Sequence, residues 1–330
     1  HDEPRWYDMD SLVYISGLSE LEAVMGDDEK LISDVSDAAR QLHPRFIALA
    51  GTPIPMITGC DLPAIAREVA GRTNIPSFAV PSNGIGTYVA GAGQALRLYA
   101  ERFITSRPEK RKNAVNILGA TPLDFSVNGC VQSMARRLTE AGFTLQSIFA
   151  MGSSFDAIDE AGAAEVNLVV SSVGLPAANY LKERFGTPYV IGAPFGDFFS
   201  PYLFDALRQS IRTGENTQVL GTCAPSAPDT VIIGESVTAK SLAAALAVGY
   251  GIGARVICPV ETPEGVLGAC DLQLEDEEEI EEALRGARRV IADPLYRRIV
   301  PAKSEFYPLP HEAFSGRIYR KQIPNLAERV

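Results

Sequence analysis

Cys60 and Asp61 place a thiol and a carboxylate side by side where both could do chemistry. They close a loop that follows an apolar run at residues 45–50, and a helical pattern begins at Pro63. This order predicts a strand, a loop and a helix, with both side chains at the N-terminus of the helix. A helix N-terminus lowers the pKa of a thiol, so Cys60 is a candidate metal ligand. The alternative is an inert small residue in a tight Gly-Cys turn.

His311 and Arg317 are the second set of candidates, near the end of the chain. An imidazole has a reference pKa of about 6.5, so His311 could donate a proton or bind a metal. Arg317 carries a planar guanidinium that could clamp a carboxylate. A surface histidine and a structural salt bridge are the alternatives. We take both as catalytic candidates.

Polar side chains also follow two predicted strands. Ser153 and Ser154 come after a strand at 145–150, where they could bind an anion at the next helix N-terminus or simply cap that helix. Asn83 follows a strand at 75–80 and is a candidate cofactor contact. The glycines after it lack the third glycine of a dinucleotide-binding fingerprint.

Short apolar runs alternate with amphipathic helical patterns along the whole chain, which predicts parallel α/β layers. We expect an α/β fold of three doubly wound, parallel-sheet (Rossmann-like) domains at residues 1–110, 111–213 and 214–330. A charged linker at 107–113 marks the first boundary. Ligands of such folds bind at the carboxyl ends of the strands. The predicted helices are 63–71, 84–103, 130–141, one ending at 185, 239–249 and 275–289.

Composition excludes several classes of protein. The net charge is −11 over 330 residues, which argues against a nucleic-acid partner. No apolar run reaches the roughly 18 residues of a membrane span, so we expect no membrane partner and a cytoplasmic location. The chain starts at His1 without a signal peptide pattern, and we expect a trimmed N-terminus. Five cysteines without a C-x-x-C pair indicate reduced thiols rather than a disulfide framework.

The order of several motifs resembles that of the nitrogenase component 1-type oxidoreductases. Each motif is weak alone, but together they cover most of the chain and imply that family's fold. The segments that carry the resemblance are residues 18–31, 52–61, 113–119, 167–170 with 180–189, and 309–319.

The resemblance also implies which metal ligands have changed. The loop cysteine of the family's bridging cluster falls at Thr52, so this chain resembles a divergent member that lacks the usual cluster cysteines. The cofactor cysteine falls at Ser171, while the cofactor histidine is kept at His311. A hydroxyl is a poor replacement for a thiolate on iron, so we expect no iron–molybdenum cofactor. Cys60 could still hold an iron–sulfur cluster shared across a dimer axis, with Thr52 and Asp61 beside it.

The resemblance implies an oxidoreductase subunit that pairs with itself or with a sister component 1-like subunit, as a dimer or tetramer. An ATP-dependent iron–sulfur reductase of the component 2 kind would supply electrons, and the substrate would be a small molecule, for which a tetrapyrrole-like compound is one option. The alternative is a non-catalytic carrier or scaffold that binds a metal cluster, a cofactor or a tetrapyrrole in an interdomain cleft. A solute-binding module that uses the cleft alone is a third interpretation.

Overall fold

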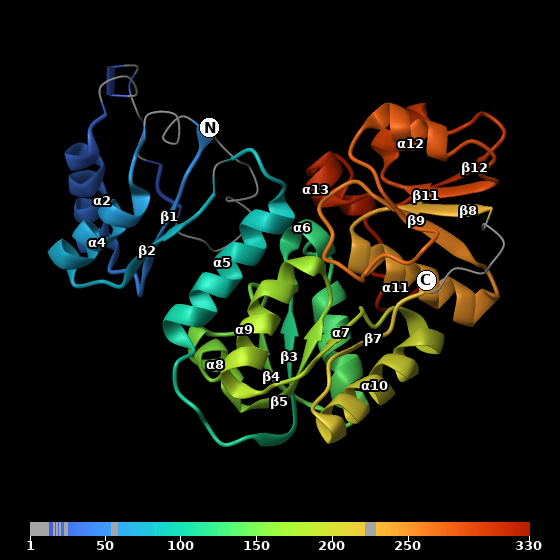
Figure 1. Cartoon of the computed structure of the whole chain (residues 1–330), viewed down its shortest axis with the longest axis horizontal. Coiled ribbons are helices and arrows are strands. Elements are labelled where there is room, and N and C mark those ends of the chain that lie inside the picture. Colours follow the sequence, from blue (N-terminus) through green and yellow to red (C-terminus); the bar gives the residue numbers. More distant parts are fainter. Residues whose placement is uncertain are drawn as a thin grey trace. The chain divides into compact units, whose positions relative to one another are not determined.

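The structure is a computed structural model that describes residues 13–15, 17, 19, 21–22, 26–53, 59–82, 84–221 and 229–330. The chain divides into two compact units, His1–Thr87 and Tyr88–Val330. Three sheets run through them, and every strand pair in the described residues is parallel (Figure 1). This confirms the α/β class with parallel, Rossmann-like sheets.

The first unit has a two-stranded sheet, β1 paired with β2, covered by two helices. The apolar faces of the helices meet in a small core of Ile32, Val35, Ile65 and Val69. Asp27 and Asp61 cap the two helices, each with a side-chain oxygen that accepts a backbone N–H. The elements are α2 (Asp28–Leu42), β1 (Ile47–Ala50), α4 (Leu62–Thr73) and β2 (Ser77–Val80).

The first sheet of the second unit has the strand order β4-β3-β5-β6-β7. Its central strand is fully buried from Ala114 to Leu118, as expected for a parallel strand with helices on both faces. In Figure 1, α7 and α10 lie on one side of this sheet and α8 and α9 on the other, with α5 packed outside α9. The elements are α5 (Tyr88–Phe103), β3 (Arg111–Leu118), α6 (Pro122–Phe125), α7 (Cys130–Glu140), β4 (Thr144–Ile148), α8 (Phe155–Asp159), β5 (Ala164–Val169), α9 (Leu175–Phe185), β6 (Tyr189–Ile191), α10 (Gly196–Thr213) and β7 (Thr217–Gln218).

The second sheet of this unit has the strand order β10-β9-β8-β11-β12. Its central strand β8 alternates: Ile232 packs into the core beneath α11, and Val231 and Ile233 pack into the core beneath α12. The elements are β8 (Thr230–Ile233), α11 (Ser236–Tyr250), β9 (Ala254–Cys258), β10 (Leu272–Gln273), α12 (Glu277–Ala283), β11 (Arg289–Ala292), β12 (Glu305–Pro308) and α13 (Glu312–Ser315), with 3₁₀ turns η2 (Ala161–Ala163), η3 (Ser172–Gly174), η4 (Pro294–Arg298) and η5 (Arg320–Gln322).

One hydrophobic core joins the two sheets of the second unit. Val115 of β3, Leu203 of α10, Ile232 of β8 and Leu242 of α11 all belong to it. The predicted boundary near residue 213 therefore falls inside one compact unit, and α5 belongs to that unit although it precedes residue 110. The division at 110 and 213 into three domains stays a prediction.

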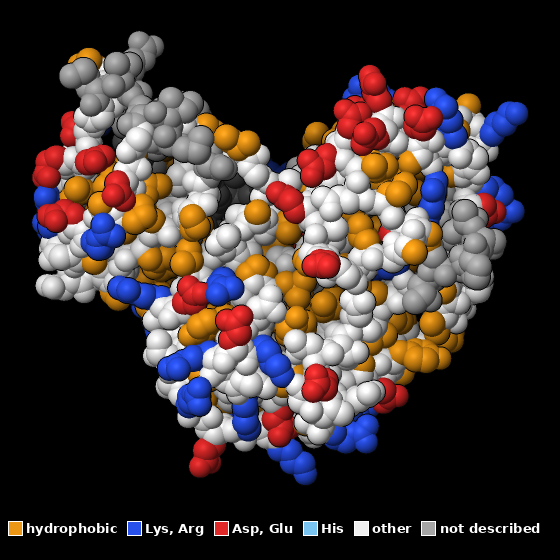
Figure 2. All heavy atoms as spheres, viewed as in Figure 1, with side chains coloured by type: hydrophobic (Ala, Val, Ile, Leu, Met, Phe, Trp, Pro, Cys, Tyr) orange, Lys and Arg blue, Asp and Glu red, His pale blue; other side chains and the backbone are white. Residues whose placement is uncertain are grey.

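Two helices differ from the sequence predictions. The predicted helix at 275–289 is the shorter α12, because the backbone tightens at Leu284 and Gly286 takes φ +86°, where a helix cannot continue. Figure 2 shows acidic side chains gathered over this part of the second unit, where α12 begins with three exposed glutamates. The 18-residue α10 was not predicted, because Pro201 lies inside it and interrupts the helical pattern.

Two further observations bear on the expected class of protein. No helix among the described residues is long and apolar enough to cross a bilayer. Cys270 is disulfide-bonded, so the expectation that all five thiols are reduced is wrong. That expectation used only the spacing of neighbouring cysteines, whereas a disulfide joins residues that are close in space.

Candidate functional site

The loops that leave β3 and β5 approach each other so closely that two glycines are required. Gly119 has φ +86°, and a Cβ there would lie 2.7 Å from the Ser171 carbonyl oxygen. A Cβ on Gly174 would lie 2.6 Å from the Leu118 carbonyl. The contact brings Ser171, at the end of β5, against the short helix α6 after β3. It thereby builds the floor of a polar cluster at the carboxyl ends of both strands.

Asp124 is the centre of this cluster. Thr121 caps α6, and its hydroxyl donates to Asp124 Oδ2 at 2.9 Å. The Ser171 hydroxyl lies 3.0 Å from the same oxygen and 2.9 Å from the Gly119 carbonyl, so its single hydrogen serves one of these two acceptors. The Tyr88 hydroxyl donates to Asp124 Oδ1 at 2.6 Å. The Asp124 side chain is fully buried. Sequence analysis placed it in an unremarked loop.

Tyr88 keeps its proton in this setting. Burial raises the pKa of its hydroxyl well above the ordinary value, and the nearby carboxylates Asp124 and Glu235 raise it further. Tyr88 therefore acts as a hydrogen-bond donor to Asp124 and not as a base.

His311 reaches the cluster from β12. The Asp293 carboxylate accepts the His311 backbone N–H at 2.8 Å and the Ser315 hydroxyl at 2.7 Å, which fixes the start of α13. His311 Nδ1 accepts the Ala313 N–H at 3.2 Å, and the ring stacks on Phe314 with centroids 4.6 Å apart. Since Nδ1 accepts a hydrogen bond, the neutral ring carries its hydrogen on Nε2.

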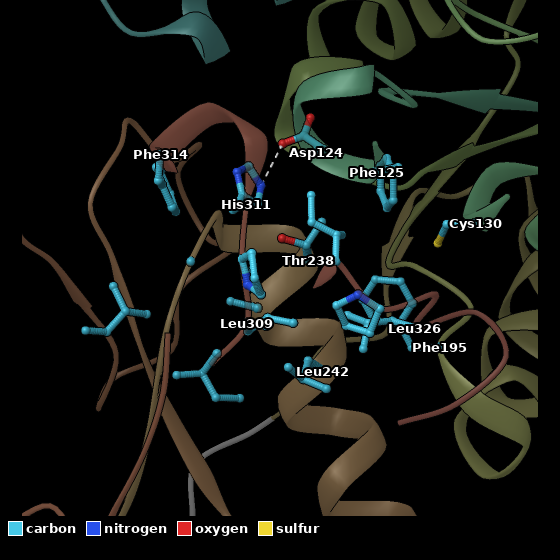
Figure 3. Close-up of a pocket in the computed structure, with 17 residues that line it drawn as sticks. Asp124, Phe125, Cys130, Phe195, Thr238, Leu242, Leu309, His311, Phe314 and Leu326 are labelled. Atoms are coloured by element: carbon cyan, nitrogen blue, oxygen red, sulfur yellow. Dashed lines mark ion pairs between the residues drawn. The ribbon is translucent and has the colours of Figure 1, made fainter. Parts of the chain in front are cut away.

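Nε2 points toward Asp124. It lies 3.5 Å from Asp124 Oδ1, which is longer than a formed hydrogen bond. Nε2 is buried and has no hydrogen-bond partner among the described residues. In Figure 3 the imidazole and the carboxylate face each other along the dashed line, at one end of a pocket.

The pocket behind this pair is small and mainly apolar. Its volume is about 50 Å³, and it lies between α6, α11 and the C-terminal segment of the chain. That volume holds a few water molecules or about three heavy atoms, far less than the several hundred Å³ of a typical cofactor site. Its apolar walls include Phe125, Phe195, Leu242, Leu309, Phe314 and Leu326.

The tail carries a second buried carboxylate, Glu312. It accepts two hydrogen bonds from Arg320, at 2.7 and 2.9 Å, and one from Ser126 at 2.5 Å. Arg317, which we predicted as a carboxylate clamp, is exposed. The arginine that pairs with a buried carboxylate is therefore Arg320, which sequence analysis missed because both arginines follow the same Ser-Gly turn.

In the first unit, Thr52 and Cys60 line a separate hollow of about 210 Å³ at the carboxyl ends of β1 and β2. Asp61 does not face a ligand there, because its carboxylate accepts the Ala64 N–H as the cap of α4. Asn83, predicted beside this loop, lies outside the described residues.

The Cys60 thiol differs from its prediction. Burial raises its pKa, and the carboxylates of Asp28 and Asp61 raise it further; Asp28 Oδ1 lies 3.7 Å from the sulfur. The prediction that the α4 N-terminus would favour the thiolate is wrong for this state, because burial and the nearby carboxylates outweigh the helix dipole.

We expect Asp28→Asn to increase the rate at which iodoacetamide alkylates Cys60 about threefold at pH 7.5, because loss of a carboxylate lowers the thiol pKa and raises the thiolate fraction. Mass spectrometry of the Cys60 peptide measures the rate. Asp37→Asn, which neutralises an exposed acid on the same helix, is the control. Equal rates in both variants would show that Asp28 does not control this thiol.

The remaining predicted hydroxyls have structural partners. Ser153 Oγ accepts the Ile148 N–H at 2.8 Å, and Ser154 caps the five-residue helix α8 by accepting the Ala157 N–H. Ser171 is brought to His311 through Asp124, whereas Ser153 and Ser154 are not brought to that cluster.

The residues present do not fit the metal groups of the resembling family. An iron–sulfur cluster takes about four thiolates, and Cys60 is the single cysteine in residues 1–87. No group of three or more His, Cys, Asp or Glu residues among those described could hold a metal ion. In the second unit, the Asp124 carboxylate already fills the space between Ser171 and His311. One chain alone therefore does not supply a complete site at either place.

Comparison with known proteins agrees with the fold. The family described as Nitrogenase component 1 type Oxidoreductase matches residues 4–220. A solved structure of nitrogenase Cp1 at pH 5 superposes with a TM-score of 0.57 at 18% identity, over 82% of this chain and 59% of that chain. At this identity the likeness shows the fold alone.

Two curated relatives point to the same family. The nitrogenase iron-molybdenum cofactor biosynthesis protein NifE of Klebsiella pneumoniae is 25% identical over 61% of this chain and 46% of its own. The B-type polypeptide of the light-independent protochlorophyllide reductase of Prosthecochloris aestuarii is 38% identical over 54% of this chain and 35% of its own. The matched parts thus cover less than half of either relative. From the family match over residues 4–220, the chain belongs to the nitrogenase component 1-type oxidoreductase family.

Proposed function

We propose that this chain is an oxidoreductase subunit that receives electrons from an ATP-dependent iron–sulfur reductase and reduces a small molecule. The observation that carries the proposal is Cys60, a partly buried thiol in a hollow at the carboxyl ends of two parallel strands, within the matched segment. Protochlorophyllide reductase subunits among the relatives suggest a tetrapyrrole-like substrate.

The proposed subunit works as an assembly. One thiol per chain cannot complete a cluster, so a second copy or a sister subunit would supply further ligands, in a dimer or tetramer. We derive no chemical step through that cluster. What this chain itself contributes is the first thiol, which has to lose its proton when it binds iron.

In the second unit the proposal assigns substrate contact to His311. Its buried Nε2–H is held toward the pocket by the Ala313 hydrogen bond and the Phe314 ring. A neutral imidazole in this tautomer donates a hydrogen bond and does not release its proton. Apolar walls exclude water around that donor, which strengthens the contact.

Iron content of the full-length protein, purified without oxygen, tests the proposal. We expect bound iron and acid-labile sulfide with a broad absorption band, and Cys60→Ser should remove both. Cys130→Ala, which removes a thiol buried in the second unit, is the matched control and should leave iron unchanged. Equal iron in Cys60→Ser and the natural chain would rule out a cluster at Cys60.

A carrier or scaffold is the second candidate, and the filled space between Ser171 and His311 favours it. Protein that stays free of iron after cluster reconstitution, and that binds a tetrapyrrole without reducing it when reductase and ATP are present, would support this function. Turnover under the same conditions would support the oxidoreductase.

A further inference from the structure

The polar end of the pocket offers one donor and one acceptor. His311 Nε2–H is the donor, buried and without a partner among the described residues, and Asp124 Oδ1 is the acceptor 3.5 Å away. A buried donor that is left unpaired costs free energy, so a native site of this kind indicates a missing partner. The pocket beside the pair is where that partner would lie (Figure 3).

The charge of Asp124 decides what can bind there. Glu312 faces the cation Arg320, and the buried Asp271 faces Lys240, but no lysine or arginine of the described residues forms an ion pair with Asp124. Three hydroxyl groups surround its carboxylate instead. The negative charge is thus not neutralised, and a second carboxylate placed against it would be strongly repelled.

We infer that this pocket binds a neutral hydroxyl group on a short apolar chain, with Asp124 as the residue that determines this specificity. The hydroxyl oxygen accepts the hydrogen of His311 Nε2, and its own hydrogen is donated to Asp124 Oδ1. The carbon atoms lie against Phe125, Leu242, Leu309 and the other apolar walls. No covalent bond changes.

This inference rests on the proposed function only in naming the group that a substrate would present to His311. It disfavours the carboxylate end of a polycarboxylate as that group. Binding of a hydroxyl compound can be measured on the chain without a reductase, a cluster or turnover. Failure here and failure of the oxidoreductase proposal are therefore separate results.

Ethanol is the probe, because three heavy atoms match a pocket of about 50 Å³. The best small ligands gain only so much per atom, so we expect a Kd no tighter than about 1 mM. Ethanol is titrated to about 200 mM while the imidazole signals are followed by nitrogen-15 NMR. The chain has three histidines, and His43→Gln removes one of them, which helps to assign His311. Acetate, similar in size but anionic, is titrated in parallel.

We expect a saturating shift of the His311 signals with ethanol and none with acetate. Gly234→Ala should abolish the ethanol shift, because Gly234 lines the pocket and a Cβ there meets Ala239 only at an ordinary 3.4 Å, so the variant should fold. Gly253→Ala, where the space is open, is its matched control. Asp124→Asn should reduce the preference for ethanol over acetate about tenfold or more.

Three results would overturn the inference. They are a shift that grows linearly without saturation, an equal shift with acetate, and an ethanol response that persists unchanged in Gly234→Ala. The first would mean an adventitious additive only. If Asp124→Asn does not fold, the comparison between Gly234→Ala and Gly253→Ala still decides the outcome.

Discussion

Lys240→Met is expected to lower the free energy of unfolding of the Tyr88–Val330 unit by about 3–5 kcal/mol. Lys240 lies in α11, and its ammonium is 2.5 Å from Asp271 Oδ2, with side-chain exposures of 2% and 0%. Removing the ammonium leaves the Asp271 carboxylate buried with two backbone N–H donors, from Val256 and Gly268, and without its cation. Two hydrogen bonds do not repay the desolvation of an unpaired charge.

A double-mutant cycle separates the pair from the packing of each side chain. Asp271→Asn alone should also be strongly destabilising, because it leaves the lysine unpaired, while Lys240→Met with Asp271→Asn should recover part of the loss. Urea unfolding followed by circular dichroism gives the four free energies. Arg97→Met, which breaks the exposed pair with Glu101, is the control and should cost less than about 1 kcal/mol. If the two single losses simply add in the double variant, the ion pair is not the cause.

The result bears on the site because α11 forms part of the pocket. Thr238, Ala239 and Leu242 line it, and the Ser241 hydroxyl of the same helix accepts the Ala193 N–H from the loop before α10. Lys240 and Asp271 pin this helix beside β9. A variant that loosens the pair should therefore weaken ethanol binding as well as stability.

Sequence patterns predicted the layers well, for local physical reasons. The run at 114–118 is apolar on both faces, and the structure buries it completely in β3. Gly142 and Gly186 end their helices with positive φ, as glycine after a helical pattern predicts. Ser154 caps α8, the alternative that we had weighed against anion binding. Each of these depends on residues within a few positions of one another.

The polar cluster could not be predicted in the same way. Asp124 and His311 are 187 positions apart (311 − 124), and Tyr88 comes from a third segment. Only the folded path of the chain brings the three together. In sequence, Thr121-Pro122-Leu123-Asp124 looks like an ordinary helix start, with Asp in the first turn. Buried carboxylates with few counter-ions became visible only with the structure.

The local geometry of Cys60 was also beyond the sequence. The helix N-terminus beside it was predicted correctly, and it was the more visible of two opposing effects. Asp28 belongs to a different helix, 32 positions earlier, yet its carboxylate is 3.7 Å from the sulfur. The sign of a pKa shift depends on the sum of such contacts, which spacing alone does not give.

Gly174→Ala is expected to lower the free energy of unfolding of the same unit by about 3 kcal/mol or more. The backbone of Gly174 has φ −77°, which any residue can adopt, so the cost is steric and not conformational. Its Cβ would lie 2.6 Å from the Leu118 carbonyl and 2.7 Å from the Gly119 nitrogen. These are backbone atoms of a buried strand end and cannot rotate away as a side chain can. The loops after β3 and β5 must therefore separate.

That separation should reach the site. Ser171 and α6 lie on opposite sides of this contact, so moving the loops apart draws the Ser171 hydroxyl away from Asp124. We expect Gly174→Ala, in conditions where it still folds, to shift the NMR signals of His311 as well as the urea midpoint. Gly253→Ala adds the same methyl group where nothing lies within 4 Å, and should change stability by less than about 1 kcal/mol in either direction. If the two variants unfold at the same urea concentration, the close approach of β3 and β5 does not hold the cluster together.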